Sequence, residues 1–149
     1  MRDCKLLTNV EENPQVVYRD IQHNGKSYRL KVIFTKHYIE RSSSRVVSFS
    51  KMFDLLEHGF QYLIEIANYN YYINSRNWKR YVKLISTRNN FAIVLQCLWS
   101  NDRYNDELGE CDYDMKLTMV TTVLNLFRCY SYSRRCRAVN NKNTFSFNV

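Results

Sequence analysis

The residues best suited to do chemistry are a histidine and two arginines spaced at helical intervals. His37 and Arg41 are four residues apart, and Arg45 follows after another four. Residues at this spacing lie on one face of an α-helix, so we expect the three side chains to share a face. Histidine exchanges a proton near neutral pH, and arginine holds phosphate oxygens through paired hydrogen bonds. The combination indicates chemistry at a phosphodiester.

The same segment also has a purely structural interpretation. A histidine at a strand-to-helix junction often caps or packs the helix end, and His37 has that position. Glu40 either acts as a second base or pairs with Lys36, Arg41 or Ser44. An exposed pair of this kind adds only a few tenths of a kcal/mol to stability.

The elements around this segment can be read from the alternation of apolar residues. Two strand-like runs, 16–21 and 27–35, are joined by a connection that contains Asn-Gly, which is a strong hairpin signal. In the second run, two cations alternate with apolar and aromatic residues. Tyr28, Leu30, Val32 and Phe34 fall on one face, and Arg29 and Lys31 fall on the other.

Helical patterns follow the hairpin. A short helix is expected over residues 36–43 and a longer one over 50–67, where Phe53, Leu56, Phe60, Leu63 and Ile64 form one apolar stripe. Gly59 lies in the middle of the longer helix, where it permits a close approach of another segment. Three more strands are expected over 79–86, 91–100 and 115–126.

Together these elements predict an α+β fold, a small and mainly antiparallel sheet with two helices packed on one face. The apolar run 91–95 has the pattern of a central strand covered on both faces. We expect one domain over residues 1–149, made of an N-terminal arm (1–14), a core (15–127) and a basic C-terminal tail (128–149).

Composition favours a polyanionic partner. The chain has 149 residues, a net charge of +8, a pI of about 9.3, and 12 tyrosines beside its many cations. Such a chain binds phosphates by releasing counterions, and tyrosine stacks on bases. We find no apolar run of about 18 residues and no amphipathic basic helix, so RNA is preferred to a membrane. The N-terminus lacks the apolar core of a signal peptide, which favours a cytoplasmic location, that of the host cell if the protein is viral.

The five cysteines, Cys4, Cys97, Cys111, Cys129 and Cys136, show no zinc-type spacing. Reduced thiols are therefore expected, with no metal and no cofactor.

The segment from Phe34 to Arg45 resembles the helix with the pattern His-x-x-(Asp/Glu)-Arg-x-x-x-Arg of RelE-like toxins and related phage endoribonucleases. The helix and antiparallel strands expected after it are also similar to that superfamily, over roughly residues 27–126. The resemblance implies the RelE-like ribonuclease fold and metal-independent cleavage of mRNA, free or bound to the ribosome. The ribose 2′-hydroxyl would attack the phosphorus and leave a 2′,3′-cyclic phosphate.

The resemblance also assigns roles to individual residues. His37 would be the acid or base, with His58 as its partner, and Arg41 and Arg45 would hold the helix or the phosphate. The family's basic or tyrosine residue in the last strand has no clear equivalent, although Arg128 and Tyr130 lie just past that strand. An acidic loop over 102–114 also has no counterpart, and is either solvated or folds over the basic surface.

Further RNA-binding residues are suggested by charge and location rather than by the resemblance. They lie around the first of the three later strands and in the tail, where basic residues alternate with tyrosines. These residues are Arg80, Lys83, Arg88, Arg128, Tyr130, Arg134, Arg135 and Arg137. The tail's alternative role is that of a solubilising segment.

The leading hypothesis is therefore a metal-independent endoribonuclease of phage or toxin origin. The alternative is a non-catalytic effector, viral in origin, that binds RNA or a host protein on the same scaffold and inhibits a host machine. An antitoxin-like or structural viral protein is a third option. Convergence of His37, Arg41 and a further cation in one cleft would distinguish the nuclease.

Overall fold

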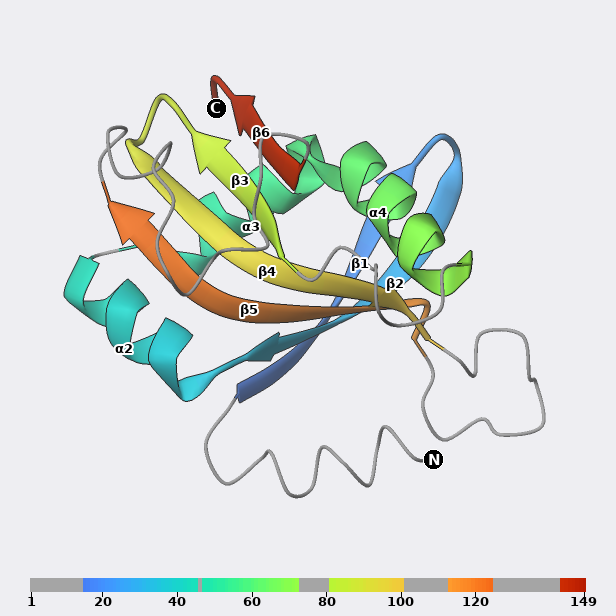
Figure 1. Ribbon diagram of the computed structural model, residues 1–149, viewed down its shortest axis with the longest axis horizontal. Helices are drawn as coiled ribbons and strands as arrows, with labels where there is room; N and C mark the ends of the chain where they lie inside the picture. The colour runs from blue at the N-terminus through green and yellow to red at the C-terminus, as the bar shows by residue number, and fades with distance from the viewer. Residues whose placement is uncertain (1–14, 46, 73–80, 101–112, 125–142) are drawn as a thin grey trace.

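The computed structural model describes residues 15–45, 47–72, 81–100, 113–124 and 143–149 (Figure 1). These residues form six strands and three helices. In chain order they are β1 (Gln15–His23), β2 (Lys26–Phe34), α2 (Lys36–Arg45), α3 (Phe49–His58), α4 (Phe60–Tyr72), β3 (Val82–Ser86), β4 (Phe91–Trp99), β5 (Met115–Leu124) and β6 (Thr144–Phe147).

The expected hairpin is confirmed. β1 pairs antiparallel with β2 from Gln15↔Phe34 to His23↔Lys26. Asn24 and Gly25 form the turn with φ values of 51° and 76°, as a two-residue type I′ turn requires. Asparagine and glycine adopt this left-handed backbone at least cost, so the local sequence fixes the register of the whole hairpin.

The α+β class is confirmed, but the sheet is mixed rather than mainly antiparallel. Its strand order is β1-β2-β5-β4-β3-β6. Neighbours pair antiparallel in β1–β2, β3–β4 and β4–β5, and parallel in β2–β5 and β3–β6. The parallel pairs join segments far apart in the chain, and periodicity within one segment carries no information on such pairing.

Three helices cover one face of the sheet, where two were expected. The predicted helix 50–67 is divided at Gly59 into α3 and α4. A Cβ atom at position 59 would lie 3.1 Å from both terminal carbons of Leu84 in β3. The anticipated close approach at Gly59 is thus real, and the chain changes direction there.

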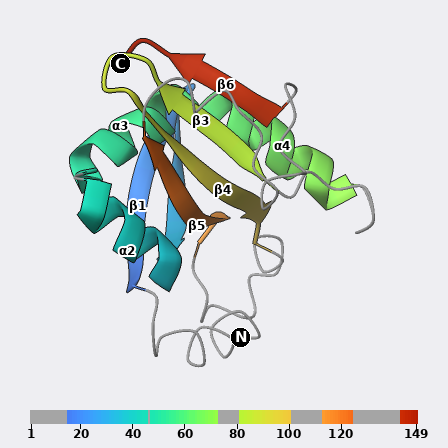
Figure 2. The ribbon, with the colours of Figure 1, turned by 60° about the vertical axis from the view of Figure 1, so that its left-hand side comes forward.

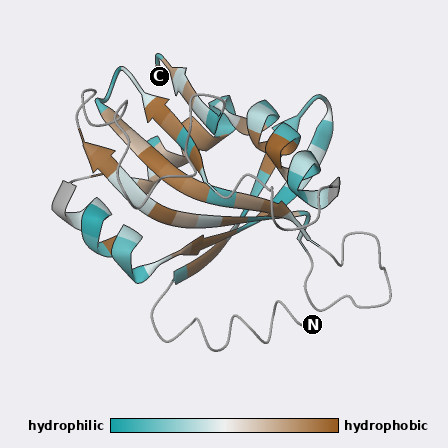
Figure 3. Cartoon of the chain, in the orientation of Figure 1, coloured by the Kyte–Doolittle hydropathy of each residue, from teal (hydrophilic) through white to brown (hydrophobic). Residues whose placement is uncertain are grey.

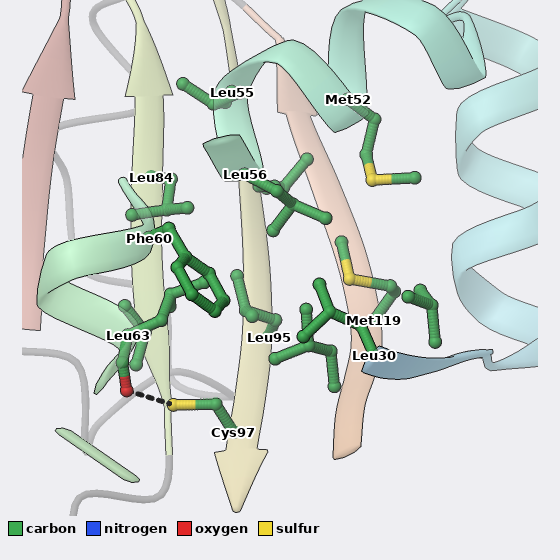
Figure 4. Packing of buried hydrophobic residues seen from close by; sticks show 14 of the residues in the cluster. Leu30, Met52, Leu55, Leu56, Phe60, Leu63, Leu84, Leu95, Cys97 and Met119 are labelled. Carbon is green, nitrogen blue, oxygen red and sulfur yellow. Dashed lines mark hydrogen bonds between the residues drawn. The ribbon is translucent and has the colours of Figure 1, made fainter. Parts of the chain in front are cut away.

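One apolar cluster joins the helices to the sheet. Tyr38 of α2, Leu56 of α3 and Leu63 of α4 pack on alternate residues of β2, β5, β4 and β3. Figure 4 shows Leu30, Leu95 and Met119 packed together within this cluster. Figure 3 shows the apolar strands beside the polar helix α2. Each fully buried side chain of this size contributes about 1.5–3 kcal/mol.

Strand β4 is covered on both faces, as its apolar run predicts. Phe91, Ile93 and Leu95 belong to the large cluster beneath the helices. On the opposite face, Ala92 packs with Ile85, and Val94 forms its own small cluster. No helix among the described residues is long and apolar enough to cross a membrane.

Strand β6 lies in the segment expected to be a basic tail. It pairs in parallel with β3 from Lys83↔Thr144 to Ser86↔Phe147. The ring of Phe145 stacks on Tyr62 of α4 at 4.4 Å, and both views of the ribbon place β6 beside β3 (Figures 1 and 2). Residues 144–147 therefore add a strand to the described sheet, and Phe145 and Phe147 pack against its core. Residues 1–14 and 128–142, expected to be an arm and the rest of the tail, lie outside the described residues.

Candidate functional site

Helix α2, which carries the predicted catalytic residues, begins at a well-defined junction with the sheet. The Thr35 hydroxyl accepts a hydrogen bond from the main-chain N–H of Tyr38 at 3.1 Å and donates one to the carbonyl oxygen of Val120, also at 3.1 Å. The first bond caps the helix and the second ties it to β5. Tyr38 is buried, which raises the pKa of its phenol well above the ordinary value and keeps it neutral.

His37 and Arg41 lie on this helix one turn apart, as predicted. His37 is half-buried and Arg41 is exposed. Arg45 is the last residue of α2, and its side chain lies outside the described part of the structure. The helix therefore carries an imidazole and a guanidinium one turn apart, and its start is tied to the middle of β5.

His58, expected to be the catalytic partner of His37, does not lie on α2. It ends α3, and its Nδ1 atom is 2.7 Å from the main-chain oxygen of Asp54. It lines an open pocket of about 410 Å³ with Glu57 and with Asp20 and Gln22 of β1. No residue of α2 is among these four, so the pocket of His58 is distinct from the surface of His37.

The other predicted RNA-binding residues are divided between buried, exposed and undescribed positions. Lys83 is only 4% exposed in β3, so its ammonium group is not presented on the described surface, whereas Arg88 is exposed in the turn after β3. The remaining candidates lie outside the described residues, namely Arg80, Arg128, Tyr130, Arg134, Arg135 and Arg137. Asp114 is the only acidic residue of the loop 102–114 that lies within the described residues.

A basic and aromatic surface that was not predicted lies on the face of the sheet opposite the helices. It is formed by side chains of β1, β2 and β5 and by the residue two before β5. We call it the outer-face cluster, and it consists of Tyr18, Arg29, Lys31, Tyr113 and Lys116.

Strand register brings these residues together. Tyr18 is opposite Lys31 across β1 and β2, and Lys31 is opposite Lys116 across β2 and β5. The guanidinium carbon of Arg29 lies 5.3 Å from the centre of the Tyr18 ring, and the Lys31 ammonium lies 5.7 Å from it. Both distances are within the range of a cation–π contact.

Burial separates the roles within the cluster. Lys31 is fully buried, with its ammonium 4.8 Å from the centre of the Tyr113 ring as well, so it holds the rings rather than contacting a ligand. Tyr18 is 44% exposed, and the side chain of Arg29 is 47% exposed. The cluster therefore offers one exposed ring and one exposed guanidinium, and the buried Lys31 ammonium supports the ring.

Two carboxylates adjoin the cluster and limit its positive charge. Asp20 lies 3.7 Å from Arg29, and both side chains are largely exposed, so the pair adds little stability. The Asp114 carboxylate accepts a hydrogen bond from the main-chain N–H of Arg29 at 2.9 Å. This second contact fixes the backbone of β2 and leaves the Arg29 side chain directed to solvent.

The sequence contained a signal for this cluster. The alternation in the second strand placed Arg29 and Lys31 together on the face away from the core, and this placement is confirmed. The signal missing from the sequence was the pairing that sets Tyr18 opposite Lys31 and β5 beside β2. In the described part of the chain, no three His, Cys, Asp or Glu side chains are placed to hold a metal ion.

The chain matches no protein-family model, and no curated protein and no solved structure matches it. The resemblance to RelE-like ribonucleases therefore stays a prediction, carried by the residues of α2.

Proposed function

We propose that this protein binds single-stranded RNA on the outer-face cluster, with Tyr18 as a platform for a base and Arg29 beside it. The observation that supports the proposal is the exposed Tyr18 ring, held by cation–π contacts with Arg29 and Lys31. A ring fixed in place before binding loses little conformational freedom when a base stacks on it. Stacking of this kind is worth about 1–3 kcal/mol per base.

The charge of the chain supports the same partner. With a net charge of +8, the protein attracts a polyanion, and the cluster then offers a specific place for the base. Lys116 is half-buried next to Lys31 and is placed to meet a phosphate along the same row of the sheet. Single-stranded RNA combines both groups, since its bases are unpaired and its phosphates are regularly spaced.

Cleavage of the RNA is the second candidate function, and a specific observation favours it. His37 and Arg41 occupy one side of α2, and the half-burial of His37 restricts its ring. In the proposed reaction His37 would take the proton from the ribose 2′-hydroxyl while Arg41 neutralises charge on the phosphate. As O2′ bonds to phosphorus, the P–O5′ bond breaks and the 5′-oxygen takes a proton from water, which gives a 2′,3′-cyclic phosphate and a 5′-hydroxyl end. His58 lines a separate pocket and takes no part in this proposed reaction.

The binding proposal is tested by Tyr18→Ala, with Tyr71→Ala as the matched control. Tyr71 is similarly exposed, at 48%, but lies on α4. For a labelled single-stranded RNA of 12 uridines, we expect the Kd of Tyr18→Ala to rise about 10-fold through loss of one stacked base. Tyr71→Ala should leave the Kd unchanged. Equal effects of the two substitutions would contradict the proposal.

Cleavage is tested separately, with mixed mRNA in EDTA and the substitution His37→Ala. If α2 is catalytic, the wild-type protein gives discrete cuts with cyclic-phosphate ends and the variant gives none. If the wild-type protein binds RNA but makes no cut, with or without ribosomes, the RNA-binding proposal stands and the nuclease proposal is contradicted.

A further inference from the structure

The outer edge of β1 has the features of a site for an additional strand. β1 is the first strand in the sheet order, and β2 is the only strand paired with it among the described residues. An edge strand presents main-chain donors and acceptors that another extended chain can use.

The hairpin turn determines which residues present those groups. A two-residue turn is closed by a hydrogen-bonded pair, here His23 and Lys26, and such pairs then alternate along an antiparallel ladder. Ile21 and Arg19 therefore bond to β2, whereas the main-chain groups of Gln22 and Asp20 point outward. By the same alternation, the main-chain groups of Tyr18 and Val16 also point outward.

An independent contact confirms this phase of the ladder. If Asp20 and Arg29 form a non-bonded pair, the main chain of Arg29 must point away from β1. It does so, because the Asp114 N–H donates to the Arg29 carbonyl oxygen at 2.8 Å and the Arg29 N–H donates to the Asp114 carboxylate.

The outward residues of β1 also line the open pocket beside α3. Asp20 and Gln22 form one side of it, and Glu57 and His58, the last two residues of α3, form the other. A strand that pairs with this part of β1 would thus run past the end of a helix, which gives its side chains a wall to contact.

The charge of this wall defines the occupant. Asp20 and Glu57 contribute two carboxylates to the pocket, and the exposed Asp54 lies one turn before His58 on α3. The carboxyl end of a helix adds partial negative charge. Arg19, on the same strand, stacks on Phe53 at 4.3 Å. Arg29 lies 3.7 Å from Asp20 in an exposed pair, which a Lys or Arg of the partner can replace at little cost.

We propose that the outer edge of β1 accepts an extended basic segment of a partner protein, which adds to the sheet as a seventh strand next to the six described. Its main chain pairs with Tyr18, Asp20 and Gln22. Its Lys or Arg side chains, at alternate positions, meet Asp20 and Glu57 beside the end of α3. The site shares β1 with the outer-face cluster, but it uses the main chain of Tyr18, whereas the RNA proposal uses the ring of that residue. It does not depend on the RNA proposal.

The test uses a fluorescein-labelled peptide of seven residues in which Lys alternates with Val, and a second peptide with Glu in place of Lys. Gln22→Pro removes one outward N–H group, which β1 can tolerate because that group is not bonded to β2. Gln22→Ala is its control, since it retains the N–H. Glu57→Lys reverses a charge on the wall without touching the strand.

We expect saturable binding of the Lys peptide, measured by fluorescence anisotropy, and none of the Glu peptide. The Kd should rise about five-fold or more for Gln22→Pro and for Glu57→Lys, and less than about two-fold for Gln22→Ala. Equal binding of the two peptides, or no effect of either Gln22→Pro or Glu57→Lys, would overturn the proposal. Because Glu57→Lys does not alter β1, misfolding of the proline variant does not remove the test.

Amide hydrogen exchange, followed by NMR, provides a second measurement on the unmodified protein. Addition of the Lys peptide should protect the amides of Tyr18, Asp20 and Gln22, while those of Arg19 and Ile21 are protected already. Protection of the outward amides before the peptide is added, together with a dimer in sedimentation, would show that a second copy of the chain takes this edge and would overturn the choice of partner.

Discussion

Helix α2 and the outer-face cluster both bring cationic groups together, but they do so in different ways. In α2, the spacing of His37 and Arg41 within one segment is enough to place them on one face. In the cluster, Tyr18, Lys31 and Lys116 come from three strands and meet only through the register of the sheet. Residue spacing therefore reveals the first kind of site, and strand pairing must be known before the second can be seen.

The two regions also differ in what holds their side chains. The cluster has cations fixed over aromatic rings, with Lys31 between Tyr18 and Tyr113. Helix α2 depends on the cap at Thr35 and the buried ring of Tyr38. We therefore expect α2 to be sensitive to loss of its core contact. Substitution of the exposed members of the cluster should weaken binding but change stability little.

The largest effect is expected for Tyr38→Ala, which removes the buried ring that joins α2 to Phe34 of β2, 5.3 Å away between ring centres. Loss of a buried aromatic ring costs about 3–5 kcal/mol of unfolding free energy. Urea denaturation followed by circular dichroism measures it. A change well below about 1 kcal/mol would show that α2 is not anchored through this ring.

The second effect is a loss of stability at alkaline pH. Burial raises the pKa of the Cys97 thiol from 9.0 to about 12, and it raises the pKa of the Tyr38 phenol as well. Between these values the folded protein retains the Cys97 proton and the unfolded chain releases it, so stability falls as pH rises above 9.0. Thermal unfolding from pH 8 to pH 11 should show a falling midpoint, and a rising midpoint would contradict the burial of both groups.

A smaller effect, on binding alone, is expected for Arg29→Ala. Its guanidinium supports the Tyr18 ring and is itself available to RNA, so we expect the Kd for single-stranded RNA to rise about three-fold to ten-fold. The control is Arg88→Ala, which removes an exposed arginine from the turn after β3. A larger loss for Arg88→Ala than for Arg29→Ala would move the RNA to the other end of the sheet.

The smallest effect is expected for Asp20→Asn. The substitution removes an ion pair of 3.7 Å between side chains that are 47% and 56% exposed. Pairs of this kind contribute about 0–1 kcal/mol, so the unfolding free energy should change little. RNA binding should become slightly tighter, because Arg29 is released and one negative charge is lost. Weaker binding would indicate that Asp20 positions Arg29 for the RNA.

Much of the fold can be predicted from local sequence. Particular residues show where such prediction fails. Asn24 and Gly25 predict the hairpin, the alternation in residues 27–35 predicts β2, and the apolar run 91–95 predicts β4. The division of the long helix at Gly59 could not be predicted, because it depends on Leu84 of β3. The strand at residues 144–147 was also missed, since its four residues gain their stability from pairing with β3 and from the stacking of Phe145 on Tyr62.

The candidate site shows the same division between local and long-range information. His37 and Arg41 lie together as their spacing requires, whereas His58, predicted to join them, lines a pocket with Asp20 of β1. Lys83 was assigned to RNA from its charge, yet the sheet buries it. Charge and spacing identify residues capable of a function, but the register of the strands determines which of them reach the surface.

The most direct test of the account is to map where RNA lies on the protein. A single-stranded RNA containing 4-thiouridine is cross-linked by long-wavelength light, and the tryptic peptides that carry RNA are identified by mass spectrometry. If RNA lies on the outer-face cluster, cross-links are expected in the peptide that ends at Arg19 and contains Tyr18, and they should be lost in Tyr18→Ala. Cross-links confined to the peptide from His37 to Arg41, or absent from the peptide containing Tyr18, would contradict it.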